Sequence, residues 1–463
     1  MVVRKMQTFY WMHKDDICTK VDVDLENGNE YEVEKLNVYF ENYTEDPLLC
    51  LFGRKESPVT LGELYEVLNT RIAPRRDNTD RFVYKNLGLK SRPFIEDLLF
   101  ITKGMLVDDF FWFCRDAENR PSFKDLRTEL CMNRPMMKLA DLHNIHFTPQ
   151  DMFGLPSIAT TASQPKFVYN GWFIKLDRWG YEAIAEMVVS ILAKYTKNIN
   201  AFEYILLNPC YNRGVCASPI YTDAMDMEFV SFWTILTKSG RLHELPSAKV
   251  NNGEDLLNKV IEIITEETGI EIEGYIKKML MWDALILNTD RHYNNMAIRR
   301  KGDGTYTTMP FFDHGLSLLS GVNEENDFLG LRARIYTDSF RQYINLAGEE
   351  NRLEIDIIGL GEHLAKIRDQ LKPDGYYSSI YKKVETILFT RLLDTKGITW
   401  YAVGREADTI NSSHYLEWQL FKGFNSSDYD YAKEVKTYIE EITSFDQSAC
   451  FTDNMEDMAY GKH

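Results

Sequence analysis

Residues 287–298 of the chain are LNTDRHYNNMAI, and residues 310–316 are PFFDHGL. The first segment follows an apolar helical pattern and predicts a polar loop that carries Asp290 and Asn295. A short strand, a glycine-containing turn and a second strand then lead to Asp313. Because the two strands bring the chain back on itself, we expect these three oxygen-bearing side chains to lie close together.

This group of side chains suits phosphoryl transfer to a hydroxyl group. The reaction needs a carboxylate that orients the acceptor or takes its proton, and oxygen ligands for Mg²⁺ ions on the phosphates. Asp290 suits the first role, and Asn295 and Asp313 suit the second. We expect His292 to brace the same catalytic loop through hydrogen bonds. A zinc or iron hydrolase is the weaker interpretation, since no third histidine lies at ligand spacing beside His292 and His314.

A lysine and two glutamates upstream complete the candidate site. Residues 167–176 predict a β-hairpin, because aromatic and β-branched residues flank an Asn-Gly pair, which favours a type I′ turn. The second strand carries Lys175 among apolar residues, and we expect a helix from about residue 181 to 195. An ion pair with Glu186 or Glu182 would hold Lys175 against the phosphates of ATP. Glu186 is favoured because it lies deeper in the helix.

Several of these motifs resemble those of a known family. Asn-x-Asp-Arg-His-x-x-Asn followed by Phe-Asp-x-Gly resembles the catalytic loop and metal-binding strand of the HipA-like kinases, which are related to the phosphatidylinositol kinases. The sequence SQPKF at residues 163–167 resembles the start of the phosphate-loop region of that family. The helix expected from residue 181 resembles the one that bears its conserved acid. The resemblance extends over roughly residues 155–320.

The resemblance implies an atypical serine/threonine kinase that uses ATP and Mg²⁺. It assigns Asp290 as the catalytic base, Asn295 and Asp313 as metal ligands and Lys175 as the phosphate-binding lysine. The acceptor would be a protein serine or threonine, including one of the chain itself. A regulatory or antitoxin-like protein partner is also implied.

Two features depart from the pattern of the family. Residues 151–166 contain Gly154 as their only glycine, so there is no glycine-rich loop. Backbone amides and polar side chains would then have to bind the phosphates. The candidate hydroxyls in this segment are those of Thr160, Thr161 and Ser163. Lys166, in the same segment, competes with Lys175 for the role of phosphate-binding lysine. In addition, the metal-binding strand has histidine rather than phenylalanine after its aspartate.

We therefore predict an α+β protein with a two-lobed, protein-kinase-like fold. Residues 1–150 would form an N-terminal α/β module of unknown role, in which Thr60 and Glu63 form a capping-box signature. Residues 151–236 would form a small lobe with an antiparallel sheet. Residues 237–463 would form a larger helical lobe whose end frays from about residue 444.

Composition excludes several other classes of protein. Among 463 residues there are 53 Lys and Arg and 70 Asp and Glu, which gives a formal net charge of −17. Such a surface opposes non-specific binding to nucleic acid or anionic lipid. The 7 cysteines are scattered without close pairs, which is typical of reduced thiols in the cytoplasm. No segment resembles a signal peptide or a membrane span, so we expect a cytoplasmic protein that acts away from membranes.

Two alternatives to a protein kinase remain open. A lipid or small-molecule kinase would use the same metal ligands, although no basic lipid-docking run is present. A catalytically inactive pseudokinase or adaptor would explain the absent glycine-rich loop. The complete set of Asp290, Asn295 and Asp313 weighs against inactivity.

Overall fold

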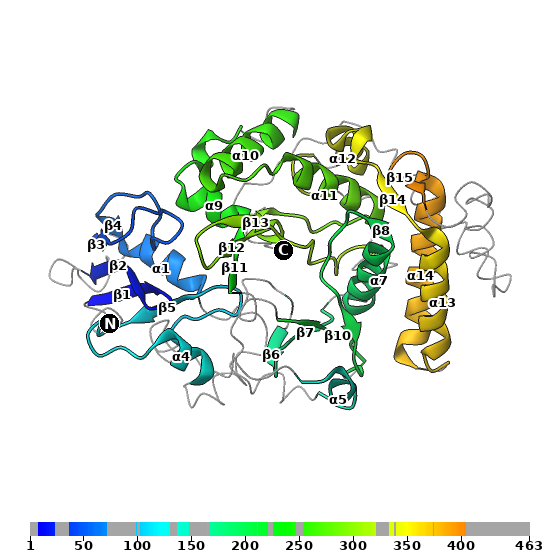
Figure 1. The fold of residues 1–463 in the computed structure, drawn as a ribbon, viewed down its shortest axis with the longest axis horizontal. Coiled ribbons are helices and arrows are strands. Elements are labelled where there is room, and N and C mark those ends of the chain that lie inside the picture. The colour runs from blue at the N-terminus through cyan, green and yellow to red at the C-terminus, as the bar shows by residue number, and fades with distance from the viewer. Residues whose placement is uncertain are drawn as a thin grey trace. The chain divides into compact units, whose positions relative to one another are not determined.

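The structure is a computed structural model, whose helices and strands are labelled in Figure 1. The chain divides into two compact units. It describes residues 8–23, 37–71, 99, 102–129, 137–147, 164, 166–178, 180–210, 212–220, 226–246, 253–320, 333–337, 339–373 and 375–403. The first unit comprises Met1–Ile174, Pro219–Glu244 and Ile298–Thr307. The second unit comprises Lys175–Ser218, Leu245–Ala297 and Thr308–His463.

The helices and strands follow in chain order, and those that start in the first unit are β1 (Thr8–His13), β2 (Asp16–Val23), β3 (Asn37–Asn42), β4 (Val59–Thr60), α1 (Leu61–Asn69), β5 (Phe111–Cys114), α4 (Phe123–Glu129), α5 (Leu139–His143), β6 (Lys166–Tyr169), β7 (Trp172–Leu176), β11 (Met227–Ser231), α9 (Phe232–Lys238), η3 (Leu242–Glu244) and β13 (Tyr306–Thr308). Those that start in the second unit are α7 (Glu182–Lys194), β8 (Thr196–Lys197), β9 (Ile205–Leu206), β10 (Val215–Pro219), α10 (Gly253–Thr268), α11 (Glu273–Ile286), η4 (Tyr293–Asn295), β12 (Ala297–Lys301), α12 (Phe340–Ala347), η6 (Glu349–Asn351), β14 (Leu353–Ile355), α13 (Ile357–Gln370), α14 (Tyr376–Thr395) and β15 (Trp400–Ala402).

The first unit contains a five-stranded antiparallel sheet with the order β4-β3-β2-β1-β5. Phe9 and Trp11 alternate along β1 and are buried in a core that also takes Leu64 of α1. Helix α1 begins at the predicted capping box, in which the Thr60 side chain accepts the Glu63 N–H and the Glu63 carboxylate accepts the Thr60 N–H. The local sequence therefore fixes where this helix starts.

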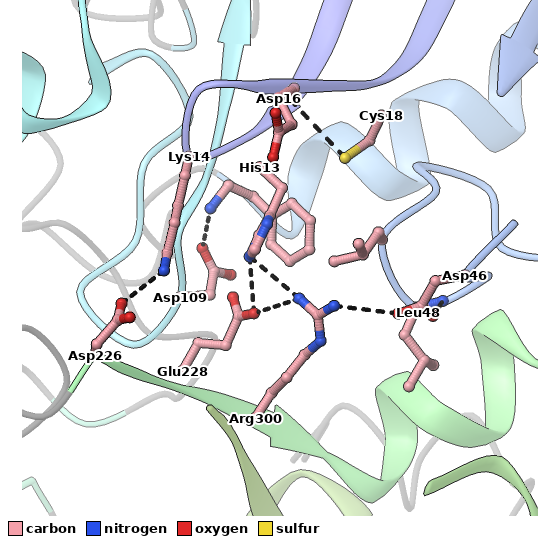
Figure 2. Close-up of polar contacts among 12 residues, drawn as sticks. His13, Lys14, Asp16, Cys18, Asp46, Leu48, Asp109, Asp226, Glu228 and Arg300 are labelled. Carbon is pink, nitrogen blue, oxygen red and sulfur yellow. Dashed lines mark hydrogen bonds and ion pairs between the residues drawn. The ribbon is translucent and has the colours of Figure 1, made fainter. Parts of the chain in front are cut away.

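A polar cluster links strands of two sheets within the first unit (Figure 2). The second of these sheets has the order β11-β12-β13. His13 Nε2 of β1 lies 2.8 Å from Glu228 Oε1 of β11, and the Arg300 guanidinium of β12 donates to the same oxygen at 3.1 Å. Arg300 also donates to Asp46 at 3.4 Å. Since Glu228 is only 3% exposed, the charge of Arg300 offsets the cost of burying this carboxylate.

Strands β6 and β7 form the hairpin that the Asn-Gly pair predicts. Asn170 has a φ of 45° and Gly171 a φ of 80°, which are the two left-handed residues of a type I′ turn. The prediction of the hairpin is confirmed. Its second strand ends at Lys175 and Leu176.

Buried helices form most of the described part of the second unit. Helix α7 is buried along nearly its whole length and packs against α13 and α14, whereas α11 packs against α12 and α14. Helix α7 and the second half of α11, residues 279–286, are buried on all sides, as expected for helices inside a core. A short sheet with the order β15-β14-β8 lies beside them, with β14 parallel to β15 and antiparallel to β8.

The described chain is thus a mixed α and β protein with several antiparallel sheets, which confirms the predicted class at that level. Within the described residues, no helix combines the length and the apolar character that crossing a bilayer requires.

Candidate active site

A buried ion-pair network in the second unit centres on Lys175, at the end of β7. Its Nζ donates to Glu186 Oε1 at 2.5 Å and to Asp313 Oδ1 at 2.9 Å, and the side chain is 3% exposed. Burial alone would lower the pKa of Lys175, but the Asp313 and Glu186 carboxylates raise it well above its ordinary value. Lys175 therefore remains a cation that two acids hold in one position.

Glu186 lies inside α7 and is fully buried. Burial raises the pKa of this carboxyl group, and contact with Lys175 opposes the rise. Its second oxygen, Oε2, accepts the backbone N–H of His314 at 3.0 Å. Glu186 thus joins the lysine strand to the segment that carries Asp313.

Glu182, the other candidate partner of Lys175, binds backbone N–H groups near the start of α7. Its Oε2 accepts the backbone N–H groups of Arg178 and Gly180 at 3.0 and 3.3 Å. The Glu182 side chain also packs so closely on Gly315 that a Cβ at that glycine would lie 3.0 Å from the glutamate Cβ. The glycine of the Asp-His-Gly sequence therefore leaves room for this close approach, which a side chain at that position would crowd.

Asp313 has an unusual backbone conformation. Its φ of 58° lies in the left-handed region, which non-glycine residues seldom adopt and which concentrates at functional sites. The Asp313 side chain is 19% exposed, so one acid of the network is accessible to solvent. The next residue, His314, is 1% exposed, and burial holds its pKa well below the ordinary value, so the imidazole is neutral.

Asp290 follows α11 in a loop with internal hydrogen bonds. Its N–H donates to Asn288 Oδ1 at 3.1 Å, and its carbonyl accepts from Asn295 Nδ2 at 2.9 Å. The Asp290 carboxylate is 28% exposed and is ion-paired with Arg334. The distance from His292 Nε2 to Asp290 Oδ1 is 4.0 Å, and burial lowers the pKa of the imidazole.

A fully buried pair that sequence reasoning missed, Asp283 and Arg291, supports this loop. Arg291 donates from Nε and NH2 to the two carboxylate oxygens of Asp283 at 2.7 and 2.9 Å. Its NH1 donates to the carbonyls of Asn295 and Phe312, the latter at 3.2 Å. One guanidinium thus fixes both the Asp290 loop and the segment before Asp313. The signal that could have revealed it is a lone aspartate within the apolar run of residues 279–287.

A second missed residue, Asp177, fixes the start of α7. Its carboxylate accepts the N–H groups of Ala183 at 2.6 Å and Gly214 at 3.0 Å. A Cβ at Gly214 would lie 2.2 Å from the Asp177 side chain, so the glycine permits this close contact. Burial, together with the charge of Glu182, raises the pKa of Asp177 to about 7.

Three other residues were predicted to bind phosphate. Two of them, Thr161 and Ser163, are outside the described residues, as is Thr160. Lys166 belongs to β6 of the first unit, where its Nζ lies 5.7 Å from the centroid of the Phe173 ring. Within the second unit, the structure therefore brings Lys175 together with Glu186 and Asp313, and it ties the Asp290 loop to the same segment.

The donor atoms of this site are oxygens. Among the described residues, no three or more His, Cys, Asp or Glu side chains form a group that could hold a metal ion by themselves. Magnesium in nucleotide sites needs only one or two protein oxygens, since phosphates and water complete its shell. The Asp313 carboxylate and the Asn295 amide each carry an oxygen of the kind that such a site uses.

No protein-family model matches the chain, and no curated protein matches its sequence. Among solved structures, the chain is similar to the proinflammatory kinase CtkA of Helicobacter pylori, with 18% identity over 62% of this chain and 89% of that chain and a TM-score of 0.31. It is also similar to a chain of the toxin–antitoxin complex of HipA, HipB and operator DNA from Shewanella oneidensis MR-1. That match has 12% identity, covers 95% of this chain and 100% of the other, and has a TM-score of 0.40.

Proposed function

We propose that the chain is a phosphotransferase that moves the γ-phosphoryl group of ATP to a hydroxyl group. The observation that carries the proposal is the buried Lys175, which contacts both Glu186 and Asp313. A lysine fixed by a helical acid, beside a partly exposed acid on a second segment, is the arrangement that binds phosphates next to a metal ion. The proposed architecture is the two-lobed kinase-like fold, with lobes at residues 151–236 and 237–463.

Each residue of the site has a role in this proposal. Lys175 binds the phosphates of ATP, and Glu186 holds the lysine in place. Asp313 and Asn295 hold Mg²⁺, which would neutralise charge on the phosphates when bound. Asn295 Nδ2 already donates a hydrogen bond to the Asp290 carbonyl, so the side-chain oxygen of Asn295 is the ligand atom in this proposal. Asp290 orients the acceptor hydroxyl and accepts its proton, while His292 braces the loop.

The acceptor we favour is a serine or threonine of a protein, including one of the chain itself. The high acidity of the chain, with a net charge of −17, disfavours a lipid headgroup as acceptor and direct binding to nucleic acid. A lipid or small-molecule kinase and an inactive adaptor are the alternatives. A regulatory, antitoxin-like protein partner and a cytoplasmic location complete the proposal.

The proposal is tested by intact mass spectrometry after incubation with Mg-ATP, together with ADP release in the presence of protein, inositol-lipid and aminoglycoside acceptors. We expect ADP formation and added phosphate on a protein hydroxyl. Asp290→Asn should reduce transfer by about 100-fold or more while nucleotide binding persists. Asp303→Asn, in an exposed turn, is the matched control and should behave as the unaltered protein.

Two results would redirect the proposal. Transfer confined to lipid or aminoglycoside would identify the alternative kinase class. Thermal stabilisation by Mg-ATP without any turnover would identify an adaptor, because a ligand that binds the folded state stabilises it whether or not it reacts. If Mg-ATP gives no thermal stabilisation and no turnover is detected, nucleotide chemistry at this site is refuted.

A further inference from the structure

Arg334 is an arginine in direct contact with the proposed catalytic base. Its NH1 donates to Asp290 Oδ1, and the two side chains are 24% and 28% exposed. We propose that Arg334 is a further catalytic residue. When ATP and acceptor are present, the Arg334 guanidinium breaks its contact with Asp290 and binds the transferring phosphoryl group. This inference rests on the proposed function, because it concerns the same reaction.

The location of the pair supports this role. A hydroxyl that Asp290 activates must lie within hydrogen-bond reach of its carboxylate, about 2.6–3.2 Å. The phosphorus atom that this hydroxyl attacks lies in contact with the hydroxyl oxygen, so it is close to the Asp290 carboxylate as well. A guanidinium that contacts Asp290 Oδ1 therefore lies beside the place where the phosphoryl oxygens arrive. Its planar, two-pronged donors match the geometry of a phosphoryl group.

Two other cations of the site pair with carboxylates other than Asp290. Lys175 is 3% exposed and contacts Glu186 and Asp313, whereas Arg291 is fully buried against Asp283. Arg334 differs because its carboxylate partner is the reacting group itself and solvent reaches both side chains. In the absence of substrate the two charges neutralise each other. On binding, the phosphoryl group offers the arginine a competing anion.

One movement would serve both parts of the reaction. The bond between the γ-phosphorus and the bridging oxygen of ADP breaks, a bond from phosphorus to the acceptor oxygen forms, and the acceptor proton passes to Asp290. When Arg334 shifts to the phosphoryl oxygens, it stabilises the charge that they carry and leaves the Asp290 carboxylate free to accept the hydrogen bond of the acceptor hydroxyl.

The test compares Arg334→Ala and Arg334→Lys with Arg352→Ala, an arginine that pairs with Glu349 at 3.0 Å on the surface of the same unit. Turnover of Mg-ATP and the thermal stabilisation given by Mg-ADP, with and without aluminium fluoride, are measured for each. The fluoride complex mimics the transferring phosphoryl group. We expect Arg334→Ala to lower kcat by about 100-fold or more, with partial recovery in the lysine variant and little change in the KM for ATP.

The expected binding result is equally specific. Arg334→Ala should keep the stabilisation by Mg-ADP and lose the additional stabilisation by aluminium fluoride, whereas Arg352→Ala should keep both. Turnover of Arg334→Ala equal to or above that of the unaltered protein would overturn the inference and identify a blocking contact or a neutral one. If Arg334→Ala keeps the additional thermal stabilisation given by aluminium fluoride, the inference is overturned, even if this variant has no turnover. Failure of the unaltered protein to bind Mg-ADP would overturn the proposed function, and this inference with it.

Discussion

Asp283 and Arg291 are two charges with no exposure to solvent, and their pairing shapes the loop that carries Asp290. Both oxygens of Asp283 accept from Arg291, and one of them also accepts from Asn288 Nδ2 at 2.9 Å. Burying such a pair is costly, but removing one partner is worse because it leaves the other charge uncompensated. These contacts explain how a polar loop keeps one conformation at the end of a buried helix.

We predict that Arg291→Met lowers the free energy of unfolding by about 3–5 kcal/mol, since it leaves Asp283 buried without a counter-charge. Adding Asp283→Asn should recover part of the loss. Urea unfolding monitored in the second unit measures both effects. The control is Arg352→Met, whose surface ion pair should contribute less than about 1 kcal/mol. An Arg291 variant as stable as this control would contradict the proposed bracing of the loop.

Lys238 of the first unit provides a prediction about pH. Its Nζ donates to the carbonyl of Leu48 at 3.1 Å and lies 5.0 Å from the centroid of the Phe111 ring and 5.6 Å from that of Trp11. Burial, with a smaller contribution from the charge of Arg71, lowers the pKa of Lys238 from 10.5 to about 8. The unfolded chain therefore binds more protons at this residue than the folded chain between these two values.

It follows that this lysine makes the folded state more stable as pH rises from about 8 to 10.5. Lys238→Met removes the effect. We expect the stability of the unaltered protein minus that of the variant to be constant near pH 6–7 and to increase between pH 8 and 10. Urea midpoints of both proteins across this range provide the measurement. A difference that stays flat or decreases would show that the lysine has its ordinary pKa.

At the scale of the helix, α11 shows how the loop that carries Asp290 begins. Leu287 ends the helix in the left-handed conformation, with φ and ψ of 55° and 49°. The carbonyls of the last turn have no partner within a helix. Arg391 of α14 donates to the carbonyls of Leu285 at 3.3 Å and Ala284 at 2.7 Å. A buried cation thus donates hydrogen bonds to carbonyls at the C-terminal end of α11 and interacts favourably with the helix dipole.

We expect Arg391→Met to destabilise the protein by about 2–4 kcal/mol, because two buried carbonyls lose charged donors. Burial lowers the pKa of Arg391 to about 10, which still leaves it charged at neutral pH. Hydrogen exchange should accelerate at the amides of residues 286–290, at the junction between helix and loop. Unchanged exchange there, with the same loss of stability, would mean that Arg391 acts through packing alone.

Signals between near neighbours were sufficient to predict several elements. The Asn-Gly pair set the hairpin turn, and Thr60 with Glu63 set the start of α1. The helix expected over residues 181–195 is α7, Glu182–Lys194. Such features depend on residues within a few positions of each other, so the sequence pattern contains them directly.

Contacts between distant segments could not be predicted in the same way. Glu182 and Glu186 share a helix face, so spacing alone left the partner of Lys175 open, and the structure places Glu186 there. The pairing of Asp290 with Arg334 joins residues 44 positions apart. The sequence predicted that Asp290, Asn295 and Asp313 lie close together, but it did not indicate which charged side chains contact the two acids.

At the scale of the molecule, the proposed site draws its residues from three separated stretches of one unit. Lys175 and Glu186 lie in the stretch Lys175–Ser218, Asp290 and Asn295 in Leu245–Ala297, and Asp313 in Thr308–His463. The five-stranded sheet of the first unit contributes none of these residues. Binding of Mg-ADP should therefore reduce local opening mainly in the second unit.

We predict that saturating Mg-ADP slows hydrogen exchange in residues 287–297 and 313–316, and leaves the amides of β1 and β2 nearly unchanged. At a ligand concentration 100 times Kd, the stabilisation should be about 2.7 kcal/mol. Lys175→Met should abolish the protection, because the phosphates lose their cation, whereas Lys197→Met, which breaks a surface pair with Glu354 at 2.8 Å, should retain it. Equal protection of β1 and β2 would instead mean that the nucleotide acts on both units together.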